Sequence, residues 1–314
     1  MEPEVSIVFT SYNHKEYLRQ ALESLLAQTY QNFELIIVDD CSTDGSQEIL
    51  KEYKNKKNVR LFLREKNSGS YVKASNYGAQ KAKGKYLLFA QCDDYAAPKQ
   101  IERLMKIFEM DEKIGVVYSR SNLIDENGNY ITDDFQGREK RFKDKHAKDS
   151  RISGVEMRDY LSFSCVIPNL SAAIIKKDLY NEAGGLPEKF LLAADWALWL
   201  ELSERTDFYY LTESLNNFRQ HPTTIRSKTK IRVQINEIYS VFYNHIKTYK
   251  LNGSETIKMK IGAGAIWFAY FIVNPRFWVK DFRGMLKDQW KHDKLSLMFL
   301  GLGGLKHVKH FLVK

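Results

Sequence analysis

Polar and acidic side chains follow three apolar runs in the first part of the chain. They are Thr10, Tyr12 and Asn13 after residues 5–9, Asp39 and Asp40 after residues 33–38, and Asp93 and Asp94 after residues 86–90. If these runs are parallel strands, their carboxyl ends share one edge of a sheet and the side chains face one crevice. Carboxylates grouped there repel each other unless a cation joins them, and hard oxygen ligands suit Mg²⁺ or Mn²⁺, which in turn suit phosphates. The pattern therefore predicts a divalent metal, Mn²⁺ or Mg²⁺, and a nucleotide diphosphate.

An acid that follows a strand also has a common structural use. A single Asp in that place more often caps a helix or fixes a turn than binds a ligand, and we assign Asp44 to that use. The adjacent pair Asp93-Asp94 differs, because turn chemistry needs only one acid. The chain contains neither GxGxxG nor GxxxxGK[ST], which disfavours Rossmann dinucleotide and P-loop chemistry. Metal and side chains must then hold the phosphates.

Apolar periodicity predicts the elements that position these residues. Apolar β-branched runs alternate with segments of helical spacing. This alternation indicates the α/β class, with an open, mostly parallel sheet flanked by helices. The predicted strands are Val5–Phe9, Phe33–Val38, Val59–Leu63, Tyr86–Ala90 and Ile114–Tyr118, and helical segments include residues 71–83 and 98–110.

The pattern loses its regularity after Ser119. Asp125–Asn129 has the composition of a hairpin turn, and residues 133–151 form a charged stretch with few apolar residues, which predicts a mobile loop. After Lys228 the chain reads as helices, and the glycines in Gly301-Leu-Gly-Gly are expected to interrupt the last of them.

Several stretches resemble a known family. The segment VSIVFTSYNHKEYLRQALESLLAQTYQNFELIIVDDCSTDGS, followed by NSGSYVKASNYGAQKAKGKYLLFAQCDDY, closely resembles the nucleotide-sugar-binding half of family 2 glycosyltransferases, which have the GT-A fold. NLSAAIIKKDLYNEAGGLPE, LAADWALWLEL and FRQHPTTIRS resemble the acceptor half of that family. The resemblance implies a GT-A domain over residues 1–228, divided into a donor half at 1–120 and an acceptor half at 121–228. It leaves residues 229–314 as a separate helical region.

The resemblance also implies roles for matching positions. The family's metal-binding DxD occurs here as Gln91-Cys92-Asp93, followed by Asp94, so its first acid is replaced by an amide. The ED pair occurs as Ala194-Asp195, and Asp195 matches the general base. The implied metal ligands are Asp93, Asp94 and His221, of which His221 is either a ligand or a phosphate contact. The implied nucleotide-sugar-binding residues are Thr10, Tyr12, Asn13, Asp39, Lys73, Asn76, Asp93 and Arg219, with Tyr12 packing on the base.

These roles fit an inverting transfer. One carboxylate must deprotonate the acceptor hydroxyl while the metal and nearby cations, with Arg226 as a further candidate, stabilise the departing diphosphate. Asp195 and Asp93 would divide these tasks. No second carboxylate is assigned near Asp195 to act as the nucleophile of a double displacement.

The charge of the chain is concentrated at one end. The net charge is +9, and residues 247–314 hold 13 Lys and Arg against four acids, so the rest is neutral. Aromatic residues accompany these cations, which allows two interpretations of residues 250–314: helices lying on an anionic membrane surface, or helices whose Trp267, Phe271, Phe277 and Trp278 pack on the catalytic domain or on a second copy. No recognised nucleic-acid module accompanies the charge, so nucleic acid is not an expected partner.

The start of the chain and its cysteines indicate the compartment. The N-terminus lacks the pattern of a secretory signal, and Cys41, Cys92 and Cys165 are odd in number with no CxxC spacing. We therefore expect a cytoplasmic protein, peripheral on the inner face of the cell membrane if the tail binds lipid.

The sequence as a whole predicts a hexosyltransferase-type inverting glycosyltransferase of cell-surface polysaccharide synthesis. Its expected donor is a nucleotide-diphosphate sugar, a UDP-sugar first, and its acceptor a glycan or a polyprenyl-linked glycan. Two alternatives stay open at this point. One is a nucleotidyltransferase, which normally needs a Gly-rich loop where this chain has TSYNHKEY, and the other is a non-catalytic binding protein with degenerate motifs.

Overall fold

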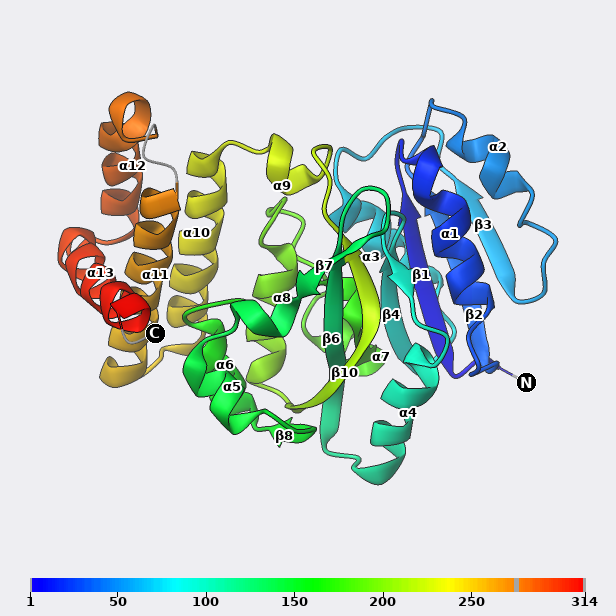
Figure 1. Cartoon of the computed structure of the whole chain (residues 1–314), viewed down its shortest axis with the longest axis horizontal. Helices are drawn as coiled ribbons and strands as arrows, with labels where there is room; N and C mark the ends of the chain where they lie inside the picture. Colours follow the sequence, from blue (N-terminus) through cyan, green and yellow to red (C-terminus); the bar gives the residue numbers. More distant parts are fainter. Residues whose placement is uncertain (1, 274–276, 313–314) are drawn as a thin grey trace.

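The computed structural model describes residues 2–273 and 277–312, and one mixed β-sheet runs through the middle of the molecule. Helices cover both faces of the sheet, and the last four helices stack beyond one of its ends (Figure 1). The strand order is β3 (Val59–Leu63), β2 (Phe33–Asp39), β1 (Val5–Ser11), β4 (Tyr86–Gln91), β9 (Ala173–Lys176), β6 (Ile114–Ile124), β10 (Asp207–Arg219) and β5 (Tyr95–Ala96), with β7 (Tyr130–Asp133) beside β6 and β8 (Ser150–Ile152) beside β10.

Helices connect most of these strands. The first half of the sheet, from β3 to β4, is parallel, while β9 enters between β4 and β6 in the antiparallel direction. The helices are α1 (Lys15–Leu26), α2 (Ser46–Lys51), α3 (Tyr71–Lys81), α4 (Gln100–Met110), α5 (Lys140–Lys145), α6 (Gly154–Leu161), α7 (Lys177–Glu182), α8 (Ala194–Ser203), α9 (Ile225–Lys228), α10 (Ile231–Tyr249), α11 (Gly253–Val273), α12 (Phe277–His292) and α13 (Ser296–Leu312), with 3₁₀ turns at Asp134–Gly137 and Leu170–Ala172.

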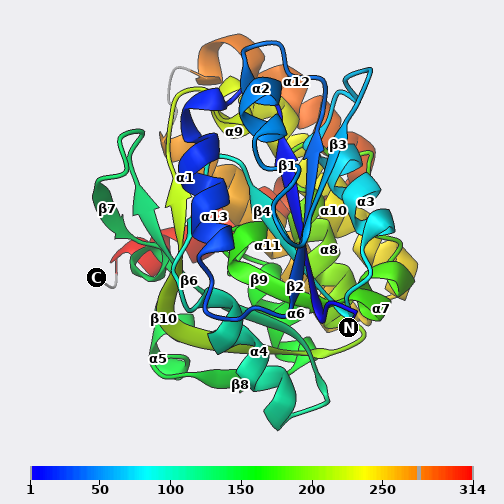
Figure 2. The same ribbon diagram turned by 90° about the vertical axis from the view of Figure 1, so that its right-hand side faces the viewer.

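Alternation along the central strands builds two hydrophobic cores. Ile7 of β1 packs in a cluster with Leu18 of α1, whereas its neighbour Val8 packs in another cluster with Val72 of α3. Figure 2 shows α1 and α4 on one side of the sheet and α3 on the other. The strands that read as continuous apolar runs are thus buried on both faces, as parallel strands require.

The register of β1 aligns the polar ends of the strands. Ser11 lies opposite Asp39 of β2, and Thr10 lies opposite Gln91 of β4. Asp93 and Asp94 follow Gln91 after a single residue, Cys92. The predicted convergence of these side chains at one edge of a parallel sheet is therefore confirmed.

Two sequence predictions about local structure were wrong, and β5, β7, β8, β9 and β10 were not among the predicted strands. Residues 133–151 are not a loop: they hold a 3₁₀ turn, α5 and the start of β8, because Phe142 is fully buried and packs its ring against Tyr210 at 5.4 Å. Helix α13 continues through Gly301 to Leu312. The sequence did not reveal β10, whose period of two is broken by register shifts around Ser214.

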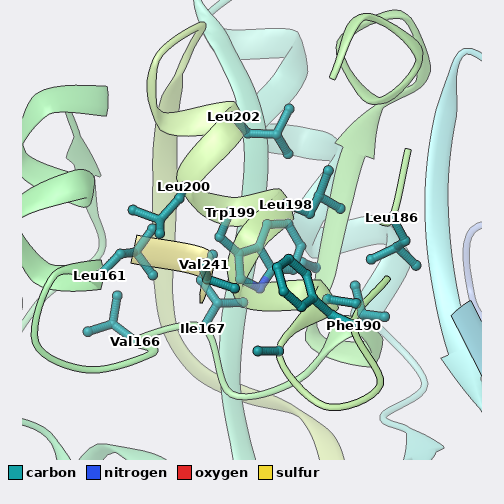
Figure 3. Packing of buried hydrophobic residues seen from close by; sticks show 14 of the residues in the cluster. Leu161, Val166, Ile167, Leu186, Phe190, Leu198, Trp199, Leu200, Leu202 and Val241 are labelled. Carbon is teal, nitrogen blue, oxygen red and sulfur yellow. The ribbon is translucent and has the colours of Figure 1, made fainter. Parts of the chain in front are cut away.

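The C-terminal helices share a core with the rest of the protein. Val241 of α10 packs in one cluster with Trp199 and Leu198 of α8, and Figure 3 shows these side chains together. Trp267 of α11 is 5% exposed and belongs to the same cluster, and Phe271 packs against it. Trp267 and Phe271 thus pack on the catalytic domain, as the second interpretation of the C-terminal helices predicted. The side chains of Phe277 and Trp278 are not among those that the structure describes.

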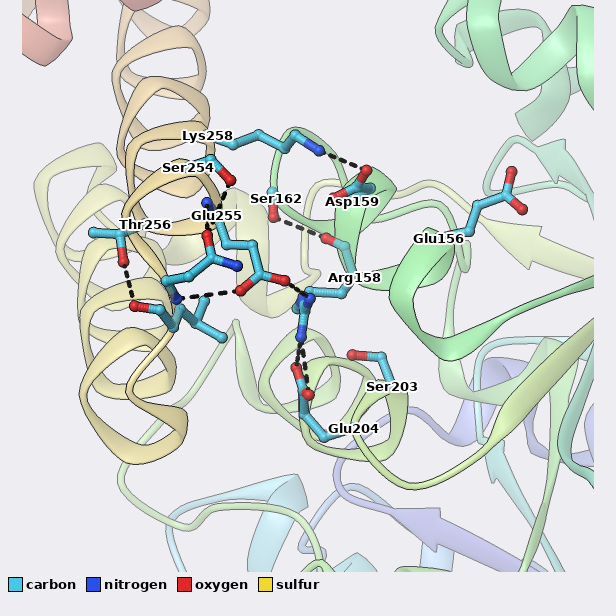
Figure 4. A network of polar contacts seen from close by, with 12 residues as sticks. Glu156, Arg158, Asp159, Ser162, Ser203, Glu204, Ser254, Glu255, Thr256 and Lys258 are labelled. Atoms are coloured by element: carbon cyan, nitrogen blue, oxygen red, sulfur yellow. Dashed lines mark hydrogen bonds and ion pairs between the residues drawn. The ribbon is translucent and has the colours of Figure 1, made fainter.

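Ion pairs reinforce this attachment, as Figure 4 shows. The Arg158 guanidinium of α6 donates to both carboxylate oxygens of Glu204, at 2.7 and 2.9 Å, and it also pairs with Glu255 of α11. Lys258 of α11 pairs with Asp159 at 2.6 Å. Residues 229–273 therefore pack on the catalytic domain and share its hydrophobic core. Within the described ranges, none of the helices is long and apolar enough to cross a membrane.

Candidate active site

Asp39 is fully buried at the end of β2, and its carboxylate is surrounded by donors. It accepts hydrogen bonds from the backbone N–H of Ser42 at 2.9 Å, from the Ser42 hydroxyl at 2.5 Å and from Nε2 of Gln47 at 3.0 Å. These donors fix the carboxylate at the bottom of the edge formed by β1 and β2.

The residues after β1 line the same edge. Thr10 is 5% exposed, whereas Tyr12 is 46% exposed and its ring is open to a ligand. The backbone N–H of Asn13 donates to the Ser42 hydroxyl at 2.9 Å, and Oδ1 of Asn13 accepts from the Thr43 N–H at 2.8 Å. Asn13 thus ties the loop after β1 to the loop after β2, next to Asp39.

Asp93 and His221 come from distant parts of the sequence and meet at the end of β4. Nε2 of His221 lies 3.0 Å from Oδ2 of Asp93, and Nδ1 of His221 lies 2.7 Å from the Thr223 hydroxyl. The His221 ring also packs on the rings of His14 and Tyr17, with centroids 5.4 and 5.2 Å away. The imidazole is held on two sides, with one nitrogen directed at the half-buried Asp93 carboxylate.

Asp94 faces the interior. It is 4% exposed, and Oδ2 accepts from Nδ2 of Asn169 at 2.6 Å and from the Ser171 hydroxyl at 2.8 Å, while Oδ1 accepts from the Arg219 N–H at 3.1 Å. Burial and the neighbouring charge of Asp93 raise the pKa of Asp94. These contacts anchor the turn that carries Asp93. They leave the Asp94 carboxylate buried, and it is not presented as a second metal ligand.

Arg219, at the end of β10, is 2% exposed and joins four segments. Nε donates to the Asp93 carbonyl at 2.9 Å, Nη1 donates to the carbonyls of Asp125 and Glu126 at 3.2 and 2.9 Å, and Nη2 donates to Oε1 of Gln20 at 2.6 Å. Four of the five N–H groups of the guanidinium thus donate hydrogen bonds within the protein. In this arrangement Arg219 positions Asp93 rather than meeting a phosphate.

Lys73 and Asn76, predicted on the nucleotide side, have different surroundings. Lys73 is exposed on α3. Oδ1 of Asn76 accepts from the Tyr180 hydroxyl at 2.5 Å and from the Leu186 N–H at 3.1 Å, and Nδ2 donates to the Leu186 carbonyl at 2.9 Å. Asn76 is therefore committed to the turn at Gly184–Leu186, while Lys73 is free to reach a ligand.

Asp195 lies in the first turn of α8. Its Oδ1 accepts from the Trp196 N–H at 2.7 Å, and within the part of the chain that the structure describes no ion pair includes it. Burial raises the pKa of Asp195 above the usual range, while the Trp196 N–H and the charge of Arg226 on α9 act in the opposite direction. A carboxylate with a raised pKa suits a general base.

Glu237 of α10 holds the backbone just before Asp195. Its two carboxylate oxygens accept from three consecutive N–H groups, those of Leu191, Leu192 and Ala193, at 2.9, 2.7 and 3.0 Å. Burial first, and then the charges of Asp195 and Glu237, hold the pKa of Tyr71 well above its usual range. Glu237 thus fixes the backbone that leads into the candidate base.

The geometry can be compared with known proteins. The family profile described as Glycosyl transferase family 2 matches residues 6–180, more than half of the chain. The protein belongs to glycosyl transferase family 2. The matched range includes β1 to β4 with Asp39 and Asp93, and it ends before Asp195.

Curated relatives of this glycosyltransferase agree with that assignment. It is 29% identical over 256 residues to an uncharacterised glycosyltransferase of Methanocaldococcus jannaschii, covering 80% of this chain and 81% of that one. It is 34% identical over 128 residues to the putative teichuronic acid biosynthesis glycosyltransferase TuaG of Bacillus subtilis, covering 40% of this chain and 50% of that one.

A solved structure supports the GT-A fold. A crystal structure of S. aureus TarS (residues 1–349) in complex with UDP-GlcNAc superimposes with a TM-score of 0.70 at 17% identity, covering 92% of this chain and 80% of that chain. At this identity the likeness concerns the fold alone. It extends into the C-terminal region, because the alignment covers most of the present chain.

Some residues of the glycosyltransferase site escaped the sequence reasoning. Glu237 lies beyond the range of the resemblance, and no spacing connects it to Asp195. Asn169 and Ser171 belong to the segment NLSAAIIKKDLYNEAGGLPE, whose match gave them no role. A polar residue flanked by apolar ones, as in Pro168-Asn-Leu-Ser, was the available signal for a buried partner.

Proposed function

We propose that this family 2 glycosyltransferase is an inverting, metal-dependent, hexosyltransferase-type enzyme that uses a nucleotide-diphosphate sugar. The observation that carries the proposal is the separation of roles between two acids. Asp93 lies beyond the end of β4 in contact with His221, whereas Asp195 stands on α8 with a raised pKa and no cationic partner bonded to it among the described residues. One acid suits the leaving diphosphate, and the other suits the acceptor hydroxyl.

The surroundings of Asp195 favour inversion over double displacement. A retaining mechanism needs a second carboxylate free to act as nucleophile. Glu237, whose charge raises the pKa of Asp195, has both of its carboxylate oxygens bound to backbone N–H groups. Asp195 would therefore take the proton of the acceptor hydroxyl as that oxygen attacks the anomeric carbon, and inversion follows.

Within the described residues no group of three or more His, Cys, Asp or Glu side chains could hold a metal ion, so a divalent cation would depend on Asp93, His221 and the donor together. Nε2 of His221 lies 3.0 Å from Oδ2 of Asp93, within hydrogen-bond distance, so the two side chains meet at one point. Asp93 and His221 would hold Mn²⁺ or Mg²⁺, with the donor diphosphate and water completing the shell. The metal would neutralise the charge of the leaving diphosphate. Asp94 would support the site from behind through Asn169 and Ser171, and Thr223 would orient the imidazole.

The donor, acceptor and place of action belong to the same proposal. The UDP-GlcNAc complex of TarS supports a UDP-sugar donor, which would lie over Thr10, Tyr12, Asn13 and Asp39 with Lys73 at its edge. The name of TuaG supports a role in cell-envelope polysaccharide synthesis with a glycan or polyprenyl-linked acceptor. Such an enzyme would work in the cytoplasm, at the inner face of the membrane, as a monomer or a homodimer.

Donor and base can be tested separately. A thermal-shift screen of nucleotide sugars with Mn²⁺ should single out a UDP-sugar, and nucleotide release with an acceptor extract should depend on that donor. Asp195→Asn should lower turnover by about 10²- to 10⁴-fold while the donor still binds. The matched control is Asp178→Asn, an exposed acid in the first turn of α7, which should keep full turnover.

Two results would overturn parts of this proposal. Retained turnover in Asp195→Asn would remove Asp195 as the base, and an α-configured product from an α-linked donor, measured by NMR, would remove inversion. Donor binding without nucleotide release under any acceptor would indicate a non-catalytic binding protein.

A further inference from the structure

The surface of α12 and α13 has an unusual composition. Residues 282–306 all have described side chains, and every exposed one among them is Lys, Arg, Gly or a large apolar residue. The exposed positions are Arg283, Lys287, Trp290, Lys291, Lys294, Leu295, Leu297, Met298, Gly301, Leu302, Leu305 and Lys306. We call this set the α12–α13 surface.

The acidic side chains of residues 282–306 are largely buried in ion pairs and do not belong to the α12–α13 surface. Asp288 accepts from Nε of Arg232 at 2.7 Å and pairs with Lys291, and Asp293 pairs with Lys260 of α11 at 2.6 Å. Their side chains are 12% and 11% exposed. The α12–α13 surface therefore presents cations and apolar groups with no exposed carboxylate between residues 282 and 306.

The apolar groups of α13 lie on its outer face. Leu297, Met298, Leu302 and Leu305 are 40–65% exposed and, at about 100° per residue, fall within an arc of about 140°. The opposite side is occupied by α11, since a Cβ on Gly303 would lie 2.2 Å from the Ala265 nitrogen. The large apolar residues thus point away from the protein, although α13 has a packed inner face.

A cluster of this kind differs from ordinary surface apolar residues. Single exposed leucines are normal, but contiguous apolar patches mark contact sites. Six large apolar residues between positions 290 and 305 are at least 40% exposed, and Figure 1 shows α12 and α13 as the outermost elements at the end of the molecule away from β3.

We propose that the α12–α13 surface docks the protein on an anionic lipid bilayer, with the outer face of α13 in the headgroup region. Leucine, methionine and tryptophan side chains would enter the acyl boundary, and Arg283, Lys287 and Lys294 would meet lipid phosphates. A second copy of the chain is a poorer occupant, because two identical cationic surfaces would face each other without an exposed acid to pair them. The inference deepens the proposed place of action, but it rests on this surface and not on the donor or base assignments.

The test is vesicle flotation of the full-length protein, since removal of α11 would expose the core around Trp267. Vesicles containing phosphatidylglycerol should retain the protein at low salt, and pure phosphatidylcholine should retain much less. Leu297→Glu combined with Leu302→Glu should lower retention at least about 100-fold, because each leucine loses its transfer free energy and adds a charge. Lys287→Gln combined with Lys294→Gln should lower it by about fivefold for each cation.

A matched control has the same charge change elsewhere. Met110 and Ile131 are 70% and 56% exposed, so Met110→Glu combined with Ile131→Glu should retain vesicle binding. Nucleotide release on a water-soluble acceptor should be unchanged in all of these variants, which separates a folding defect or a failure of the catalytic proposal from a failure of docking. Full retention of the Leu297→Glu, Leu302→Glu variant would overturn the proposal. The proposal would also be overturned if the wild-type protein did not bind anionic vesicles at low salt and instead formed a dimer, with the Leu297→Glu, Leu302→Glu variant being monomeric.

Discussion

The carboxylate of Glu237 accepts a hydrogen bond from the backbone N–H of Ala193 at 3.0 Å, two residues before Asp195. The same group binds the N–H groups of Leu191 and Leu192. Because Glu237 lies on α10, a helix of the C-terminal region fixes the segment that presents the proposed base. The proposed catalytic arrangement therefore extends beyond residue 228, where the resemblance to the family ends.

Removal of the Glu237 carboxylate should impair catalysis more than donor binding. Glu237→Ala leaves three N–H groups without their acceptor and frees the backbone before Asp195, and a misplacement of about 1 Å can cost about 100-fold in rate. We expect kcat to fall by about 10- to 100-fold with little change in the donor Kd, measured by calorimetry. Glu213→Gln, which alters a half-exposed surface acid, is the control and should leave both unchanged. Equal losses in kcat and donor affinity would contradict a positioning role.

The pH profile should separate two neighbours of Asp195 by the sign of their effect. A base must be ionised, so kcat/KM falls as pH decreases through the raised pKa of Asp195. The charge of Arg226 lowers this pKa and that of Glu237 raises it. Arg226→Gln should therefore move the acid limb of the profile to higher pH, and Glu237→Gln should move it to lower pH. Shifts in the same direction would show that the limb belongs to another group.

The parallel half of the fold could be predicted from the sequence because each element carries its own signal. The strands around Val38 and Phe89 are apolar runs, with Asp39 at the end of the first and Asp93 two residues after the second. β10 carried no such signal, since register shifts interrupt its alternation. The contact of Glu237 with Ala193 joins positions 44 residues apart in different elements, and no local pattern encodes it.

Arg219 could be recognised as important, but its role depends on tertiary contacts. Its guanidinium is buried and holds the Asp93 carbonyl, the turn after β6 and Gln20 of α1 together. Lysine keeps the charge but lacks the planar fork, so Arg219→Lys should lower the free energy of unfolding by about 2–4 kcal/mol. Urea denaturation measures this change. Arg103→Lys, at an exposed pair with Glu213, should cost less than about 1 kcal/mol, and a similar cost at both sites would contradict the anchoring role.

The contact between His221 and Asp93 predicts a graded response to metal. His221→Ala should raise the Mn²⁺ concentration needed for half-maximal donor binding by at least about tenfold, because one proposed ligand is lost. Thr223→Val removes only the hydroxyl that lies 2.7 Å from Nδ1, and it should have a smaller effect, up to about tenfold. Titration calorimetry of Mn²⁺ in the presence of UDP measures this Mn²⁺ dependence without requiring turnover. Thr212→Val, a threonine bonded to Asp149, is the control. Unchanged Mn²⁺ dependence in His221→Ala would place His221 outside the metal site.

The same substitution at two glycines of α13 should have opposite effects on stability. A Cβ at Gly301 has open space around it, so Gly301→Ala should stabilise the helix by about 0.5–1 kcal/mol through lower backbone entropy in the unfolded chain. A Cβ at Gly303 would lie 2.2 Å from the backbone nitrogen of Ala265, and α11 cannot move without disturbing Trp267 in the core. Gly303→Ala should therefore destabilise the protein by about 1–3 kcal/mol. Thermal denaturation of the two variants beside the wild type gives the comparison, with Gly301→Ala serving as the control for helix propensity. Stabilisation by both substitutions would show that α13 does not pack against α11 in solution.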